Sequence, residues 1–410
     1  MTSETEPRTA FVWIWLPNAT DPVVAGRLDQ RDREITFTYG TSYLDLPNSI
    51  PIYLPELPLE RGAHLPLAGT GLPLCISDAA PDAWGRRVIN HRLSSGVSDY
   101  QELTYLLESG SDRIGALDFQ TSPTEYNART SAESTLVELT DAAALIESGE
   151  SLTPQLELAL LHGSSVGGAR PKALLADGPR RLIAKFSSSQ DTYPQVKAEF
   201  VAMELARRVG LDAAAVEYTN VAGRDVLLVE RFDRAAGGTR RLMVSSLTIL
   251  GLDEFPGGRY ASYTDLADQI RSRFTDADET LRELFGRIVF NILCGNTDDH
   301  GKNHAAFFDG STLTLTPAYD ICPQHRSGEI AGQAMAFGLG GVRDSKLIHC
   351  IEAAGIYHLH ADEAREIIDT QVAMIKSSWD EVCDVAQLSA AQREAFIGRQ
   401  FLNPYIFYDI

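Results

Sequence analysis

An amphipathic helix that ends at a polar segment is the feature that most constrains the fold. Apolar residues recur at i, i+3 and i+4 spacing across positions 281–293, which predicts a buried helix. Gly295 follows as a stop, because glycine readily adopts the left-handed conformation found at helix ends. Residues 296–303 then read Asn-Thr-Asp-Asp-His-Gly-Lys-Asn. A rigid helix therefore delivers a segment rich in carboxylate and amide groups to one place.

This segment, together with Tyr319-Asp320, has the residues that a phosphoryl-transfer centre needs. Asp298 lies five positions before Asn303, and Asp320 lies beyond a predicted hairpin. In kinases one Asp orients the attacking hydroxyl, while an Asn and a second Asp hold Mg²⁺ on the phosphates. Asp and Asn are also common in loops and helix caps, so the prediction needs support from other parts of the chain.

A hairpin within residues 304–316 is predicted to bring the metal ligands together. Its two strands are joined at Asp309-Gly310, a strong turn signal. Pairing across this turn would set Asn303 opposite Thr316 and return Asp320 toward Asn303. Oxygen ligands of this kind suit Mg²⁺.

Other residues of the segment are given supporting roles. Lys302 could stabilise charge on the transferred phosphoryl group. His300 and Tyr319 are placed among the nucleotide-binding residues, although His300 could equally pack within the loop for structural reasons. A metal role for this histidine is disfavoured beside hard oxygen ligands.

A Gly-rich element precedes the segment at residues 163–172. Glycines let backbone N–H groups approach phosphates closely, and two basic side chains add positive charge. The spacing of a Walker A loop is absent, and an ordinary Gly/Ser surface loop is the alternative. The candidate nucleotide-binding residues here are Gly167, Gly168, Ala169, Arg170, Pro171 and Lys172.

Lys185 stands on a predicted strand, 182–186, in the position of the phosphate-binding lysine of protein kinases. Such a lysine needs a helix carboxylate to orient it. The predicted helix 195–209 offers Glu199 and Glu204, and Glu199 lies nearer the apolar face. The alternative is a strand lysine that faces solvent.

A strand at residues 226–234 is a candidate hinge between two lobes. Backbone groups of Glu230 and Phe232 would bond the adenine edge, and Arg231 lies between them. A core strand that leads into a charged turn is the alternative. All these elements occur in kinase order along the chain, which strengthens each assignment.

The sequence resembles the HipA family of serine/threonine kinases, the toxins of bacterial type II toxin–antitoxin pairs. The resemblance covers nearly the whole chain, and residues 298–303 are its most specific part. The matching segments are residues 39–54, 81–87, 164–172, 229–234, 296–303 and 315–320.

The resemblance implies a role for each matching residue. Asp298 becomes the catalytic base, Asn303 and Asp320 the Mg²⁺ ligands, Lys185 the lysine that binds ATP phosphates, and Glu199 its partner. The family autophosphorylates a serine of its Gly-rich loop, which ejects the loop and disables ATP binding. The corresponding residue here is Ser165, with Ser164 as a second acceptor. A dianionic group there would repel ATP phosphates.

The resemblance also implies partners. These are a protein substrate, in some members an aminoacyl-tRNA synthetase, and a small helix-turn-helix antitoxin. DNA would be reached only through that antitoxin. The net charge of −20 repels nucleic acid and anionic membranes and would favour a basic partner, although it also serves solubility. Two alternatives stay open: a small-molecule kinase of the same superfamily, and a non-catalytic corepressor bound to an antitoxin.

The size of the chain predicts several domains. With 410 residues, we expect an α+β, bilobal, protein-kinase-like fold: a β-rich subdomain at 1–112, the rest of the N-lobe at 113–234 and a helical C-lobe at 235–410. No apolar run approaches the roughly 20 residues of a membrane helix, so we expect a cytoplasmic protein. Five scattered cysteines without CxxC spacing predict free buried thiols.

Overall fold

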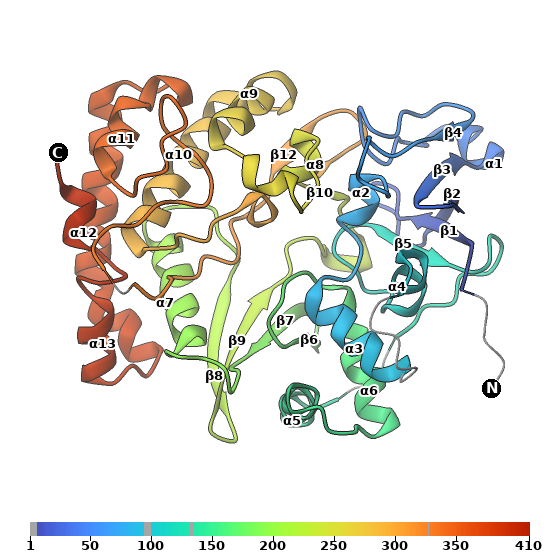
Figure 1. The fold of residues 1–410 in the computed structure, drawn as a ribbon, viewed down its shortest axis with the longest axis horizontal. Coiled ribbons are helices and arrows are strands. Elements are labelled where there is room, and N and C mark those ends of the chain that lie inside the picture. The colour runs from blue at the N-terminus through green and yellow to red at the C-terminus, as the bar shows by residue number, and fades with distance from the viewer. Residues whose placement is uncertain (1–5, 94–99, 131–133, 327) are drawn as a thin grey trace.

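The computed structural model describes residues 6–93, 100–130, 134–326 and 328–410 (Figure 1). Its first region is built on a five-stranded antiparallel sheet of order β4-β3-β2-β1-β5. Along β1, the alternate residues Ala10, Val12 and Ile14 are fully buried, because successive side chains of a strand point to opposite faces. The strands are β1 (Thr9–Ile14), β2 (Val23–Arg31), β3 (Glu34–Tyr39), β4 (Ala63–His64) and β5 (Leu117–Gln120).

The helices of this part of the chain are α1 (Thr41–Leu44), α2 (Leu74–Ser77), α3 (Ala83–Leu93) and α4 (Glu102–Glu108). Helices α1 and α4 contact the sheet, whereas α3 packs against α6 (Pro154–His162) of the second region. Because β5 pairs with β1, the first sheet extends past residue 112, where the sequence analysis placed the domain boundary. Residues 50–54 resemble a strand in sequence but form a loop with an isolated bridge between Tyr53 and Leu57. Pro51 and Pro55 have no N–H to donate to a ladder, which explains the difference.

The second region holds the Gly-rich element and a four-stranded antiparallel sheet of order β6-β7-β9-β8. Helices α5 (Leu136–Ser148) and α6 (Pro154–His162) begin at Thr135 and Thr153, whose hydroxyls accept backbone N–H groups. The strands are β6 (Lys172–Asp177), β7 (Arg180–Phe186), β8 (Val216–Val221) and β9 (Arg224–Glu230), and α7 (Gln195–Arg208) packs on β9.

The C-terminal region is mainly helical. Its long helix α12 (Ala361–Val385) packs against α7 and thereby joins the two lobes on one side (Figure 1). The other elements are β10 (Met243–Ser245), α8 (Ser246–Leu250), α9 (Tyr263–Arg273), α10 (Ala277–Cys294), β11 (Ala305–Phe308), β12 (Leu313–Leu315), α11 (Leu347–Glu352) and α13 (Ala390–Phe396). Strands β10, β11 and β12 form a small sheet in that order.

Helix α10 ends where the sequence predicts. Gly295 is its C-cap with φ +70°, in the left-handed region. A Cβ at this position would lie 2.6 Å from the carbonyl oxygen of Gln400, so only glycine fits without a shift of the backbone. This close approach fixes the point at which the polar segment 296–303 leaves the helix.

The hairpin forms, but its predicted register is wrong by two residues. Ala306 pairs with Leu315 and Phe308 with Leu313, so Asn303 does not lie opposite Thr316. The loop is longer than a two-residue turn because the carboxylate of Asp309 accepts hydrogen bonds from the backbone N–H groups of residues 311 and 312, both at 2.8 Å.

Two further expectations concern burial. All five cysteines are free and buried, which confirms the prediction made from their spacing. In the part of the chain that the structure describes, no helix is both long and apolar enough to cross a bilayer.

Candidate active site

A cavity of about 410 Å³ lies where the Gly-rich element, β7, α7, the end of β9 and the segment 296–303 meet. Its volume falls within the range of small-molecule sites in proteins. Sixteen of the predicted site residues line it: Gly167, Gly168, Ala169, Arg170, Lys172, Lys185, Glu199, Glu230, Arg231, Phe232, Asp298, His300, Lys302, Asn303, Tyr319 and Asp320. Pro171, Ser164 and Ser165 lie outside this lining.

The Gly-rich element begins as a buried 3-10 turn, Gly163–Ser165, and continues as a loop over the cavity. Gly168 has φ +109°, and its position leaves room for the ammonium of Lys172 to bond the carbonyl of Gly167. Lys172 is only 3% exposed. Burial lowers the pKa of this ammonium to about 8, because the charged form is poorly solvated there.

Lys185 is held between two carboxylates. Its Nζ lies 2.5 Å from Oε1 of Glu199 on α7 and also pairs with Asp320. Although burial opposes the charge, these carboxylates raise the pKa of Lys185. The other candidate, Glu204, bonds Arg208 on its own helix at 3.1 Å, away from the cavity. The structure therefore identifies Glu199 as the partner of Lys185, whereas the sequence favoured Glu199 only slightly over Glu204.

Asp320 occupies an unusual backbone conformation at the end of the hairpin. Its φ of +59° lies in the left-handed region, which Asp tolerates better than most residues. Lys185 holds the pKa of this carboxyl below its usual range. The preceding Tyr319 donates its hydroxyl to the carbonyl of Lys302 at 2.6 Å, and so ties the two arms of the site together.

Of the two adjacent aspartates, only Asp298 is free to face the cavity. Asp299 is buried and accepts hydrogen bonds from Asn291 at 2.7 Å, from Nε2 of His304 at 2.8 Å and from the hydroxyl of Tyr263. Asp298 is exposed and lines the cavity. Asp299 therefore anchors the loop, and Asp298 is the aspartate that the loop presents to the cavity.

The rest of the segment is also anchored. The carbonyl of His300 accepts the backbone N–H of Asn303 at 2.8 Å, and the imidazole of His300 is exposed at the cavity. The carbonyl of Gly301 accepts the hydroxyl of Ser246 at 2.5 Å. These contacts hold a single 3-10 turn, Gly301–Asn303, in place.

Two groups of the predicted hinge are engaged within the fold. The backbone N–H of Glu230 donates to the carbonyl of Ala215 at 2.9 Å, so the sheet already uses that donor. The guanidinium of Arg231 is buried against Asp233 at 2.8 Å and the carbonyl of Arg113 at 2.6 Å. Arg231 thus joins the first region to the sheet rather than reaching into the cavity with its charge. Phe232 remains available, with its ring 5.7 Å from that of Tyr319.

Sequence reasoning missed the contribution of the first region. Asp78, Asp82 and Ala83 line the cavity together with Glu254 of the C-lobe. Oδ1 of Asp82 lies 2.6 Å from Nζ of Lys302, and Glu254 lies 2.9 Å from the same ammonium. Residues 81–87 stand out in the sequence only as a segment that resembles the family, and not as part of the active site. Spacing along the chain cannot show that residues 220 positions apart are in contact.

The donor set fits a nucleotide with a hard divalent cation. Lys172, Lys185 and the Gly-rich loop line the cavity, as do apolar Val166, Ile183 and Val229. Asn303 and Asp320 supply one amide and one carboxylate oxygen. Within the described ranges, no cluster of three His, Cys, Asp or Glu side chains forms a metal cage. Such a sparse oxygen set suits Mg²⁺, which is commonly bound by one or two carboxylates plus phosphate oxygens.

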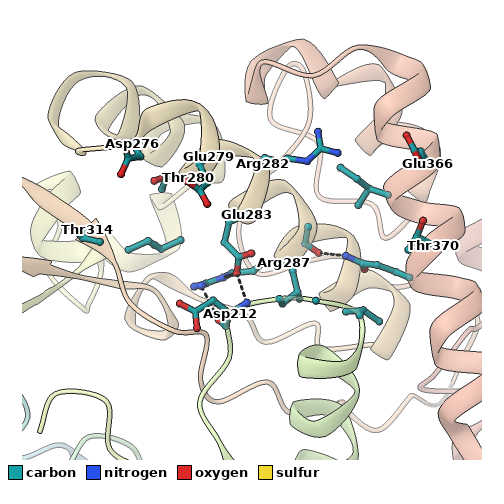
Figure 2. A pocket seen from close by; sticks show the side chains of 17 residues that line it. Asp212, Asp276, Glu279, Thr280, Arg282, Glu283, Arg287, Thr314, Glu366 and Thr370 are labelled. Carbon is teal, nitrogen blue, oxygen red and sulfur yellow. Dashed lines mark hydrogen bonds and ion pairs between the residues drawn. The ribbon is translucent and has the colours of Figure 1, made fainter. Parts of the chain in front are cut away.

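A second cavity, of about 600 Å³, is lined by residues 209–212 after α7 and by parts of α10, β12 and α12, and none of the predicted residues lines it (Figure 2). Figure 2 shows Arg287 beside Asp212 and Glu283. The guanidinium bonds Glu283 at 2.7 Å and the carbonyls of Asp212 and Thr316 at 3.1 and 2.9 Å. These bonds attach helix α10 to the end of the hairpin, so Arg287 has a structural role beneath the site.

Comparisons with known proteins show which family this chain belongs to. A family model described as the HipA-like C-terminal domain matches residues 164–379, more than half of the chain. A model of the HipA N-terminal domain matches residues 18–120. The chain is 27% identical over 336 residues to "Putative kinase Y4mE" of Sinorhizobium fredii, covering 73% of this chain and 75% of that protein.

Two further similarities involve Shewanella oneidensis. Its serine/threonine-protein kinase toxin HipA is 29% identical over 187 residues, which cover 38% of this chain and 42% of that protein. A solved structure, of the Shewanella oneidensis HipA, HipB and operator DNA complex, superposes with a TM-score of 0.67 at 20% identity and covers 93% of this chain and 97% of that one. This likeness shows the expected fold, α+β and bilobal. The chain belongs to the HipA family of kinases.

Proposed function

We propose that this protein is an ATP- and Mg²⁺-dependent serine/threonine kinase that phosphorylates a bacterial protein and acts as a HipA-like toxin. The observation that carries the proposal is the position of Lys185. It is paired with Glu199 and Asp320 at the wall of a cavity that Asp298 faces. A lysine oriented by a helix carboxylate, beside an Asp/Asn/Asp set, is the arrangement that kinases need for phosphoryl transfer.

Each side chain has a task in the proposed reaction. Lys172, Lys185 and the N–H groups of the Gly-rich loop, apart from that of Gly168, which bonds Asp82, would hold the nucleotide phosphates. Asn303 with Asp320 would hold the metal. Bound Mg²⁺ would neutralise charge on the phosphates. Asp298 would accept the proton of the attacking hydroxyl. Lys302 would stabilise charge on the transferred group.

Exchange of Asp298 for asparagine tests this function. Asp298→Asn keeps the size of the side chain but removes the base, so we expect nucleotide binding close to wild type and phosphate incorporation reduced at least about a hundredfold. The measurement uses radiolabelled ATP, with binding followed by calorimetry. Full phosphate transfer by the variant would refute the role of Asp298.

Autophosphorylation at Ser165 is part of the same proposal. Ser164 and Ser165 are almost completely buried, and the hydroxyl of Ser164 donates to the carbonyl of Leu161 at 2.6 Å. The loop must therefore leave this position before either serine can accept phosphate. We expect peptide mapping after incubation with ATP to find phosphate at Ser165, and Ser165→Ala to remove most of it. Label on neither serine would favour a small-molecule acceptor.

The proposed partner is a small, basic, helix-turn-helix antitoxin, with DNA reached through it. The support is family membership, the net charge of −20 and the fold shared with a HipA that was solved with HipB and operator DNA. A protein substrate, such as an aminoacyl-tRNA synthetase, belongs to the same proposal. A complex with antitoxin that never transfers phosphate at saturating Mg-ATP would instead support a corepressor.

A further inference from the structure

The segment 78–84 of the first region reaches both walls of the active-site cavity. On the C-lobe side, the carboxylate of Asp78 accepts the backbone N–H of Ser245 and the hydroxyl of Thr248, both at 2.7 Å. Asp82 then pairs with Lys302 at 2.6 Å. The segment is therefore fixed to the lobe that carries Asp298.

The same segment also holds the Gly-rich loop. Oδ2 of Asp82 accepts the backbone N–H of Gly168 at 2.7 Å. The backbone N–H of Trp84 donates to the carbonyl of Gly168 at 3.3 Å, and its indole donates to the carbonyl of Lys172 at 2.9 Å. Around Gly85 the packing is tight, since a Cβ there would lie 1.8 Å from the carbonyl oxygen of Ser164.

Asp82 is the one side chain of this segment whose two oxygens contact opposite walls. One oxygen bonds Gly168 in the phosphate-binding loop, and the other bonds Lys302 beside the catalytic aspartate. We propose that Asp82 is a positioning residue, which sets the distance between the Gly-rich loop and Lys302 for phosphoryl transfer. The first region would then complete the active site, a role that rests on the proposed kinase function.

Charge and burial support this assignment. Asp82 and Lys302 are both about one-fifth exposed in their side chains, so solvent screens their attraction only in part. Although burial opposes ionisation, Lys302 keeps the pKa of Asp82 below its usual range, and the carboxylate is charged at neutral pH. A misplacement of about 1 Å at a reacting centre costs on the order of a hundredfold in rate, so a lost contact here is measurable.

Two substitutions separate the two contacts. Asp82→Asn keeps an oxygen for the N–H of Gly168 but offers no charge to Lys302. We expect its kcat to fall at least about tenfold, with KM for ATP within about threefold of wild type. Asp82→Ala loses both contacts, so we expect the same fall in kcat together with a rise of about tenfold in KM for ATP. Asp45→Asn, an exposed change in the same region, serves as the matched control and should leave both constants unchanged.

Hydrogen exchange provides a readout that needs no catalysis. In nucleotide-free protein, amides of residues 163–172 should exchange faster in Asp82→Ala than in wild type, while Asp82→Asn stays close to wild type. A kcat of Asp82→Asn within twofold of wild type would overturn the proposal. A lower KM for ATP at unchanged kcat would also overturn it, because the carboxylate of Asp82 would then compete with the ATP phosphates for the loop.

The same experiment distinguishes failure of the proposal from failure of the kinase function. If wild-type protein transfers no phosphate to itself or to added proteins, the kinase assignment fails. In that case hydrogen exchange, which needs no catalysis, still tests whether Asp82 holds the Gly-rich loop. Unchanged exchange of residues 163–172 in Asp82→Ala, in protein that melts like wild type, would show that this side chain does not hold the loop.

Discussion

The ammonium of Lys185 and the carboxylate of Glu199 meet at 2.5 Å, although one stands on a strand and the other on a helix. Glu199 is 2% exposed and packed within the fold, so its carboxylate helps to determine how the side chain of Lys185 is oriented. We expect Glu199→Gln to lower kcat/KM for ATP at least about tenfold, because an amide cannot neutralise the lysine. Steady-state kinetics with ATP as the varied substrate measure the effect.

Glu204→Gln is the matched control for this prediction. It lies on the same helix, and its carboxylate bonds Arg208 rather than Lys185. The control should behave as wild type. Equal loss of activity in both variants would mean that charge on α7, and not the contact with Lys185, supports the activity.

Asp299 should matter for stability in a way that Asp298 does not. Its buried carboxylate accepts hydrogen bonds from Asn291 and Tyr263 and lies 2.8 Å from Nε2 of His304. Asp299→Asn places an amide where acceptors are needed, so we expect the free energy of unfolding to fall by about 2–4 kcal/mol. Urea denaturation followed by circular dichroism measures this. Asp298→Asn, exposed at the cavity, should unfold at the wild-type midpoint.

Lys172 should make nucleotide binding depend on pH. Its pKa is lowered to about 8 by burial, so its positive charge is present below pH 8 and is lost as the pH rises above it. Affinity for the anionic phosphates should therefore fall between about pH 7 and pH 9. Calorimetric titration with ATP across this range tests the sign. Lys172→Arg stays charged and should flatten the profile; a profile that is equally steep in the variant would assign the effect to another group.

The sequence was sufficient to predict features that depend on local chemistry. The end of α10 at Gly295 follows from helix periodicity and from the left-handed conformation of glycine. Lys185 and its helix carboxylate were predicted by their order along the chain, and they do meet.

Features that depend on contacts distant in sequence could not be predicted in the same way. The hairpin register differs from the predicted one because the carboxylate of Asp309 accepts backbone hydrogen bonds within the turn and lengthens the loop. The hinge donor of Glu230 is used by Ala215, a pairing that strand propensity does not reveal. Asp82 reaches Lys302 only because the first region folds over the cavity, and no local pattern encodes this contact.

Arg287 should stabilise both the fold and the proposed metal site. It is 2% exposed and bonds the carbonyl of Thr316, which lies four residues before Asp320. Arg287→Met leaves buried carbonyls without a donor, so we expect a loss of about 2–4 kcal/mol in the free energy of unfolding and a higher Mg²⁺ requirement. The control is Arg282→Met on the same helix, where a half-exposed side chain meets Glu363 at 3.4 Å, and it should cost under about 1 kcal/mol. Because Arg287 acts through the hairpin, a variant that loses stability at an unchanged Mg²⁺ requirement would show that Asp320 is positioned independently of α10.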